Sequence, residues 1–283
     1  MLNDEILTTI EMAHAFGSAF TRDQVYRFLK IPVSKKTYND CINELIDEEI
    51  IAEKNSRLMK SEIDEQCHEK QQFSRALLKR YHFELKFLSR LPWVRFIGLT
   101  GANAFESCKK DDDIDLFMVT NVDKLWITYL MIVLFGKITG KRERLCLNYL
   151  VDENNLTLLP KNYYAAVQLV QMKPLFNQNY KERLIYKNSW LFDCLPNAGD
   201  SFEIDSNYLI RGDHPERRTK SLPLLSRVNR FIYKKYRGRL ERKYPEQIGK
   251  SIILGSGVAK LHRVDHQHVY DKNFHVVKER AVS

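Results

Sequence analysis

Two aspartates, Asp113 and Asp115, are separated by one residue and stand at the start of the apolar run 116–119. Such a run is typical of a buried strand, on which successive side chains alternate between two faces. The two carboxylates therefore share a face, roughly 6 to 7 Å apart along the chain, and Ile114 and Phe117 remain for the core. Carboxylates aimed at one point are ligands for hard divalent cations. The pattern predicts a metal site, and a structural pair held by salt bridges is the alternative.

A glycine turn at Gly101 precedes this pair by twelve residues. Glycine lets the backbone approach phosphate oxygens because no Cβ intervenes. Asn103 and Ser107 could add hydrogen bonds to a phosphate. Lys109 and Lys110, on the loop before the acids, could contribute positive charge, although a solvated loop explains these lysines equally well. Turn and acids together predict a site for a phosphate-bearing ligand and a cation.

Alternating strand and helix patterns surround the acids and must position them. The expected elements are a helix over 73–91, a strand over 93–99, a short helix over 102–108, a strand over 114–120, an apolar helix over 122–137 and a strand over 144–151.

The first 62 residues predict three short amphipathic helices and two short strands. The helices are expected over 4–16, 21–30 and 35–49, and the strands on either side of the polar turn 54–56. This order resembles a winged helix-turn-helix, a family whose third helix enters the DNA major groove. The third helix here ends in Glu44, Asp47, Glu48 and Glu49, and a DNA-reading face should be basic. Residues 1–60 could therefore contact either DNA or a protein partner.

The chain after residue 160 looks mainly helical, with breaks near Pro174 and Pro196, and its end is strongly basic. Residues 211–283 carry a net charge of +11, against −2 for residues 1–60 and +9 for the whole chain. Basic residues between 227 and 243 alternate with aromatic ones, a pattern that could contact RNA or a triphosphate. An amphipathic helix that buries its aromatic residues is the alternative. His262 and His266 have helical spacing for zinc, but surface histidines explain them better.

Composition indicates a soluble, cytoplasmic protein that is not inserted in a membrane. The five cysteines form no CxxC pair, which argues against a disulfide framework and a zinc knuckle. The acidic start of the chain is unlike a signal peptide. The longest apolar run, 125–136, is too short to span a bilayer.

The segment 96–152 resembles the polymerase-beta-like nucleotidyltransferase superfamily, whose signature is an hG[GS] turn followed, about a dozen residues later, by [DE]h[DE]h. The corresponding residues are Thr100-Gly101-Ala102 and Asp113-Ile114-Asp115-Leu116. Residues 75–280 also look like a subgroup of uncharacterised bacterial nucleotidyltransferase-domain proteins. The resemblance implies an α+β fold with a small mixed-sheet nucleotidyltransferase core over 63–160, an N-terminal winged helix over 1–62 and a basic, mainly helical C-terminal domain over 161–283.

The resemblance also implies a transferase that moves a nucleoside monophosphate from an NTP such as ATP to an acceptor and releases pyrophosphate. Asp113 and Asp115 would be catalytic and bind Mg²⁺ or Mn²⁺, while Gly101, Ala102, Asn103, Ser107 and Lys109 would bind the nucleotide. The acceptor could be a small molecule, a protein or RNA.

Two residues depart from the family pattern. Ala102 lacks the hydroxyl that the family's usual serine offers to phosphate. The third carboxylate, which the family places on a neighbouring strand, would have to be replaced by Asn148 or supplied by Asp152. A non-catalytic nucleotide-sensing regulator that binds DNA or a protein is therefore the alternative function.

Overall fold

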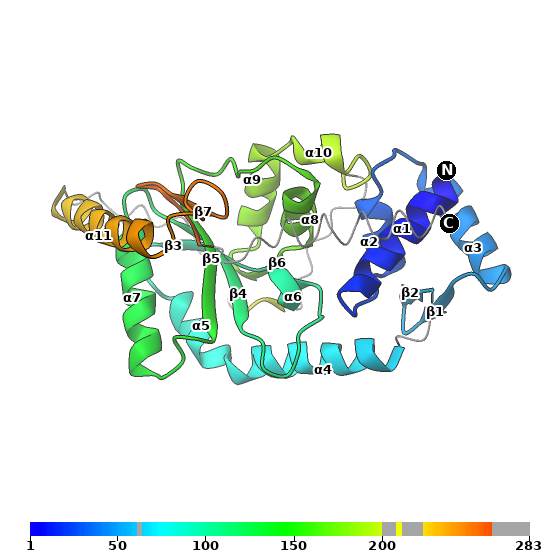
Figure 1. Cartoon of the computed structure of the whole chain (residues 1–283), viewed down its shortest axis with the longest axis horizontal. Helices are drawn as coiled ribbons and strands as arrows, with labels where there is room; N and C mark the ends of the chain where they lie inside the picture. Colours follow the sequence, from blue (N-terminus) through cyan, green and yellow to red (C-terminus); the bar gives the residue numbers. More distant parts are fainter. Residues whose placement is uncertain (61–63, 200–207, 211–222, 262–283) are drawn as a thin grey trace.

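The computed structural model describes residues 1–60, 64–199, 208–210 and 223–261. His262, His266 and the rest of the histidine cluster lie outside the described residues. Within the described part, the fold is α+β with a mixed sheet, as expected, and that sheet has six strands. Figure 1 shows an elongated molecule with the N-terminal unit at one end, the sheet in the middle and helix α11 at the other end.

Three helices and a two-stranded sheet form the N-terminal unit, in the expected order. They are α1 (Leu2–Ala15), α2 (Arg22–Phe28), α3 (Lys35–Asp47), β1 (Ala52–Lys54) and β2 (Arg57–Met59). Helix α2 begins at a capping box in which the Thr21 hydroxyl accepts from the Gln24 backbone N–H and the Gln24 side chain accepts from the Thr21 N–H. Ser34 caps α3 by accepting from the Thr37 N–H.

The helix expected over 73–91 is two helices, so that prediction was wrong. Helix α4 (Asp64–Arg80) runs from the N-terminal unit to the sheet, and α5 (His82–Leu88) follows it. The break lies at Tyr81, whose φ of −102° and ψ of 14° are not helical. The Tyr81 ring is buried in the same core as Leu77 and Leu85, so the bend lets both helices pack on that core.

The six-stranded sheet has the order β6-β3-β4-β5-β8-β7. Its strands are β3 (Val94–Leu99), β4 (Ile114–Thr120), β5 (Leu145–Asp152), β6 (Lys173–Phe176), β7 (Ile252–Leu254) and β8 (Val258–Leu261). Strands β4 and β5 are parallel, and helix α7 (Leu125–Ile138) connects them, whereas the other neighbours are antiparallel.

Three of these strands come from the part of the chain expected to be mainly helical. Besides α8 (Tyr163–Gln171), α9 (Asn179–Lys187), α10 (Leu191–Cys194) and α11 (Pro223–Lys243), this part contributes β6, β7 and β8. The sheet is therefore not confined to residues 63–160. Pro174, which predicts a break, lies in β6, an edge strand, and edge strands tolerate proline.

Each face of the sheet packs against a different core. Ile114, Leu116 and Met118 belong to one core with residues of α5, α7 and α11, whereas Phe117 and Val119 belong to the other, with residues of α8, α9 and the N-terminal helices. Strand alternation places Asp115 on the Phe117 side. The acids therefore face α8 and the N-terminal unit.

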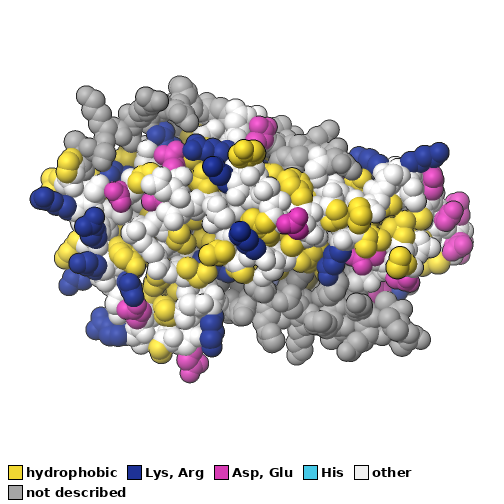
Figure 2. All heavy atoms as spheres, turned by 90° about the horizontal axis from the view of Figure 1, so that it is seen from above, with side chains coloured by type: hydrophobic (Ala, Val, Ile, Leu, Met, Phe, Trp, Pro, Cys, Tyr) yellow, Lys and Arg dark blue, Asp and Glu magenta, His cyan; other side chains and the backbone are white. Residues whose placement is uncertain are grey.

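Charge is distributed unevenly along the molecule. Figure 2 shows dark blue basic side chains gathered at the α11 end and several acidic ones at the opposite, N-terminal end. Within the described ranges, the structure has no helix with both the length and the apolar character needed to cross a bilayer.

Candidate functional site

The start of β4 holds the two acids against the glycine turn. Asp113 immediately precedes β4, and Asp115 is its second residue. The Thr100 backbone N–H donates to the Asp115 carbonyl at 3.0 Å, which ties the turn to the strand. The acid pair and the turn predicted from the sequence therefore lie together.

Gly101 is required at the turn for two reasons. Its φ is +59°, a left-handed conformation that costs side-chain-bearing residues roughly 1 to 2 kcal/mol. A Cβ at this position would also lie 2.3 Å from Asp115 Oδ2, far inside van der Waals contact. The close approach of the Asp115 carboxylate to the backbone therefore depends on glycine.

The acids lack a neutralising partner among the residues that the structure describes. Neither Asp113 nor Asp115 forms a salt bridge with any residue that the structure describes. Burial, with the negative charge of Asp113, raises the pKa of Asp115 to about 7, although a hydrogen bond from Asn148 acts in the opposite direction. An uncompensated pair of half-buried carboxylates is a favourable place for a cation.

Strand β5 brings two further side chains to the pair. The Asn148 amide Nδ2 donates to Asp115 Oδ1, and the Cys146 thiol donates to Asn148 Oδ1 at 3.0 Å. The strand register shifts between Leu116 and Phe117, which leaves Asn148 without a strand partner in β4, a bulge of the kind that re-aims side chains beside sites.

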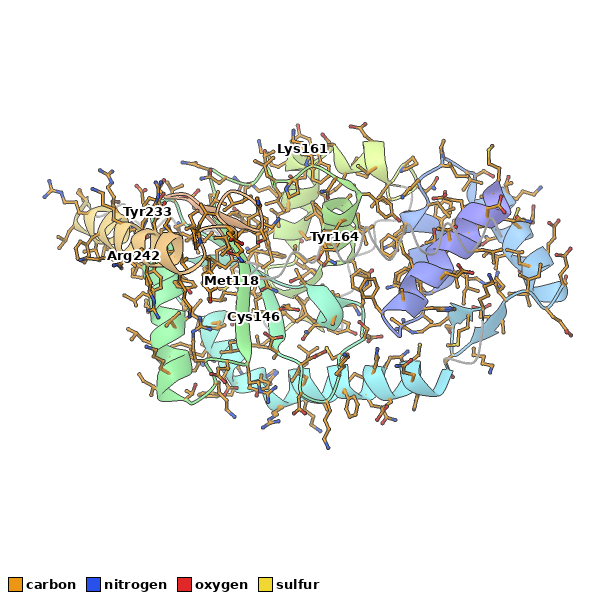
Figure 3. All side chains as sticks on the ribbon, in the orientation of Figure 1. Met118, Cys146, Lys161, Tyr164, Tyr233 and Arg242 are labelled. Carbon is orange, nitrogen blue, oxygen red and sulfur yellow. The ribbon has the colours of Figure 1, made fainter. Side chains whose placement is uncertain are left out.

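Cys146 is the neighbour that the sequence analysis missed. It pairs with Asp115 across the parallel strands, and its sulfur and the Asp113 and Asp115 carboxylate oxygens all lie within 4.8 Å of one another. Figure 3 labels Cys146 on β5. Burial and the two aspartates raise the pKa of Cys146, so that it is a neutral thiol. Only the pairing register could have revealed it, and a register is not visible in the sequence.

Asp152, the other residue considered as a third ligand, lies at the far end of the strand. It pairs with Thr120, five residues beyond Asp115, about 17 Å along a strand. Its carboxylate accepts hydrogen bonds from Asn154 and Asn155. Of the two candidates, Asn148 is the one beside the acid pair.

The residues expected to bind the nucleotide differ from one another in burial and in hydrogen bonding. Asn103 is buried, donates to the Asp113 carbonyl at 2.9 Å, and has an Oδ1 with no hydrogen-bond partner among described residues. The Ser107 hydroxyl donates to the Ala102 carbonyl at 3.3 Å. Lys109 is exposed and does not line the pocket at the acids.

A pocket of about 390 Å³ opens beside the acids, and much of its wall is apolar. Helix α8 contributes Tyr164, labelled in Figure 3, and Gln168, whose side chain accepts from the Gly101 N–H at 3.3 Å. Helix α1 contributes Met12 and Ala13, and Phe16 follows directly after it. Among described residues, the one cationic side chain in the wall is Lys260 of β8, which the sequence analysis did not single out.

Specific contacts fix the N-terminal unit in this position. Asn197 accepts from the Val33 N–H at 3.0 Å and donates to the Ile31 carbonyl at 2.9 Å. The Tyr163 hydroxyl donates to the Phe28 carbonyl at 2.7 Å. The N-terminal unit is thus part of the pocket wall.

Comparison with known proteins identifies no relative: no family model, no curated protein and no solved structure matches the chain.

Proposed function

We propose that the protein is a metal-dependent nucleotidyltransferase, which moves a nucleoside monophosphate from an NTP to an acceptor and releases pyrophosphate. The observation that supports this most directly is the Asp115 carboxylate held against the Gly101 turn with no salt-bridge partner among the described residues. A cation held by this carboxylate could in turn bind the phosphate oxygens of a nucleotide beside the turn.

The residues present fit Mg²⁺ or Mn²⁺. Asp113 and Asp115 offer hard carboxylate oxygens, and Asn148 offers a neutral amide oxygen, with water completing the usual octahedral shell. Cys146, as a neutral thiol, would stay outside that shell and act as a hydrogen-bond donor to Asn148. Bound there, the cation would neutralise the charge of the triphosphate and of the departing pyrophosphate.

The pocket's own charge makes nucleotide binding depend on that cation. Asp112, Asp113 and Asp115 line the pocket, and the cation contributed by the described part of its wall is Lys260. A triphosphate would be repelled by this surplus of negative charge without metal. Metal-free protein is therefore expected to bind an NTP weakly.

The apolar wall suits the part of the ligand that carries no phosphate. Its volume of about 390 Å³ is within the range of small-molecule sites, about 300 to 1,000 Å³. Phe20 and Phe105 line it together with Tyr164, and aromatic rings of this kind stack on a base. We expect the N-terminal unit to help select the base or the acceptor.

A second candidate is a nucleotide-sensing regulator without catalysis. Asn148 occupies a place beside the acids where a third carboxylate could act as a base, and an amide cannot take a proton. Helix α3 exposes Asp40, Glu44 and Asp47, so its surface suits a protein partner better than DNA.

The decisive experiment is incubation with each labelled NTP, Mg²⁺ and a cell lysate, followed by measurement of pyrophosphate release. Asp113→Asn should abolish turnover in a folded protein. The matched control is Asp111→Asn, because the side chain of Asp111 is 87% exposed and pairs with Arg144. Equal turnover in the two variants would refute the proposal.

A gain of function separates the two candidates. Asn148→Asp supplies a third carboxylate next to Asp115, and in a transferase it should increase Mg²⁺ affinity and maintain or raise turnover. Nucleotide binding without pyrophosphate release in both the wild type and Asn148→Asp would favour the regulator.

A further inference from the structure

A second cavity, of about 1110 Å³, lies between α2, α4 and β6. Among described residues it shares only Met172 with the pocket at the acids. Gln171 and Lys173, on either side of Met172, face this second cavity, and so does Glu106, which follows α6 (Gly101–Ala104). The cavity is therefore a separate compartment next to the candidate active site.

Positive charge dominates the lining of this cavity. Its described cations, from five different elements, are Arg27, Arg57, Arg75, Lys79, Lys173 and Lys181. The carboxylates among the same lining residues are Asp23 and Glu106. At neutral pH, among the described residues of this lining, the positive charges outnumber the negative ones by four.

The two carboxylates are already engaged by this lining. Glu106 forms a buried salt bridge with Arg57 and lies 3.8 Å from Lys173 Nζ. Burial by itself would raise the pKa of Glu106, but Lys173, a hydrogen bond from Tyr208 and the nearby arginines lower it, so the carboxylate is ionised. Asp23 pairs with Arg27 at 2.5 Å.

Two of these positive charges are exposed and so accessible to a ligand. Arg75 and Lys79 lie one helical turn apart on α4, both are exposed, and they form the rim of the cavity. Lys173 lies deeper, with 11% of its side chain exposed. Walls of low dielectric around a concave site of one sign focus its field and attract counter-ions.

From this arrangement we infer that the cavity binds an anionic ligand that carries several phosphate groups. Arginine forks match the geometry of phosphate oxygens, and lysines add point charges around them. A single small anion would neutralise only part of an excess of four charges. The phosphates could belong to a free nucleotide or to an RNA strand. The inference does not depend on the catalytic proposal, because no residue of the acid pair takes part.

The test is binding of inorganic tripolyphosphate in EDTA and low salt, measured by calorimetry, so that the acid pair cannot contribute through a metal. Arg75→Gln with Lys79→Gln removes two exposed rim charges. Because glutamine is neutral, the double variant adds no negative charge that would repel Glu106. The matched control is Arg227→Gln with Arg230→Gln on α11, which removes two exposed charges outside the cavity.

We expect the rim variant to weaken binding at least tenfold and the α11 variant to change it less than twofold. Tripolyphosphate that fails to bind, or that loses equal affinity in both variants, would overturn the inference. Lys173→Gln, measured with its melting temperature, repeats the test inside the cavity and should also weaken binding. A short single-stranded RNA bound more tightly than tripolyphosphate, and lost in the rim variant, would assign the phosphates to nucleic acid.

Discussion

Replacing Gly101 by alanine tests the geometry on which the candidate site depends. The substitution forces a residue with a side chain to adopt a φ of +59° and puts a Cβ 2.3 Å from Asp115 Oδ2. Gly140 is the matched control, because its φ is +69° and no atom lies within 4 Å of the corresponding Cβ. The two alanine variants therefore share the backbone penalty and differ in the contact with the carboxylate.

The shared penalty is roughly 1 to 2 kcal/mol, the cost of a left-handed residue that carries a Cβ. A loss of this size lowers the melting temperature by about 2 to 4 °C per kcal/mol in chains somewhat shorter than this one. In Gly101→Ala the carboxylate must also retreat from 2.3 Å to at least 3.4 Å, where ordinary contact begins. A displacement of about 1 Å in a catalytic group can reduce the rate about 100-fold.

Both variants should be measured by thermal unfolding, by Mn²⁺ titration and by NTP turnover. We expect Gly140→Ala to lose stability but to keep its Mn²⁺ affinity and its NTP turnover. Gly101→Ala should lose more stability, bind Mn²⁺ at least tenfold more weakly, and turn over about 100-fold more slowly. Mn²⁺ affinities that are the same in both variants would show that the turn does not position Asp115 for a cation.

Three further predictions concern the charges at the site. The pKa of Asp115 is about 7 in the folded protein, against 3.8 for an ordinary aspartate. Between these two pH values the folded state therefore binds a proton that the unfolded state has lost. Metal-free protein should lose about 2 to 3 kcal/mol of stability from pH 5 to pH 8. Melting curves in EDTA check this, and an Asp115→Asn variant that keeps the same slope would contradict it. Cys146→Ser should leave Mg²⁺ affinity within twofold, since a neutral thiol is no magnesium ligand; a large loss in titrations would instead indicate a thiophilic metal. Lys260→Ala should weaken NTP binding about tenfold, the effect of one charged hydrogen bond. Lys109→Ala should leave NTP affinity unchanged, because Lys109 lies outside the pocket. A larger loss of NTP affinity in Lys109→Ala than in Lys260→Ala would show that Lys109 belongs to the site.

Local patterns in the sequence were sufficient for several elements. The helix expected over 21–30 begins at Arg22, within one residue of the prediction, because its capping box of Thr21 and Gln24 involves only neighbouring residues. The apolar run after Asp115 predicted β4 over 114–120, the bounds that the structure has. The helix expected over 73–91 failed at Tyr81, where packing in the core outweighs helical periodicity.

The sequence by itself therefore determined that Asp113 and Asp115 stand at the start of a strand and that a glycine turn precedes them. Alternation and turn formation act over a few residues, so they can be read from the order of residues alone. That Asp115 lies against the backbone of Gly101 was decided only when β3 and β4 paired.

Tertiary structure alone decided which distant residues surround the acids. Cys146 and Asn148 reach them through the parallel register of β5, and the wall supplied by α1 depends on docking of the N-terminal unit. The same holds for the cationic cavity, whose lining comes from segments far apart in the chain. Strand register and docking depend on the packing of whole elements against one another, and no short stretch of sequence contains that information.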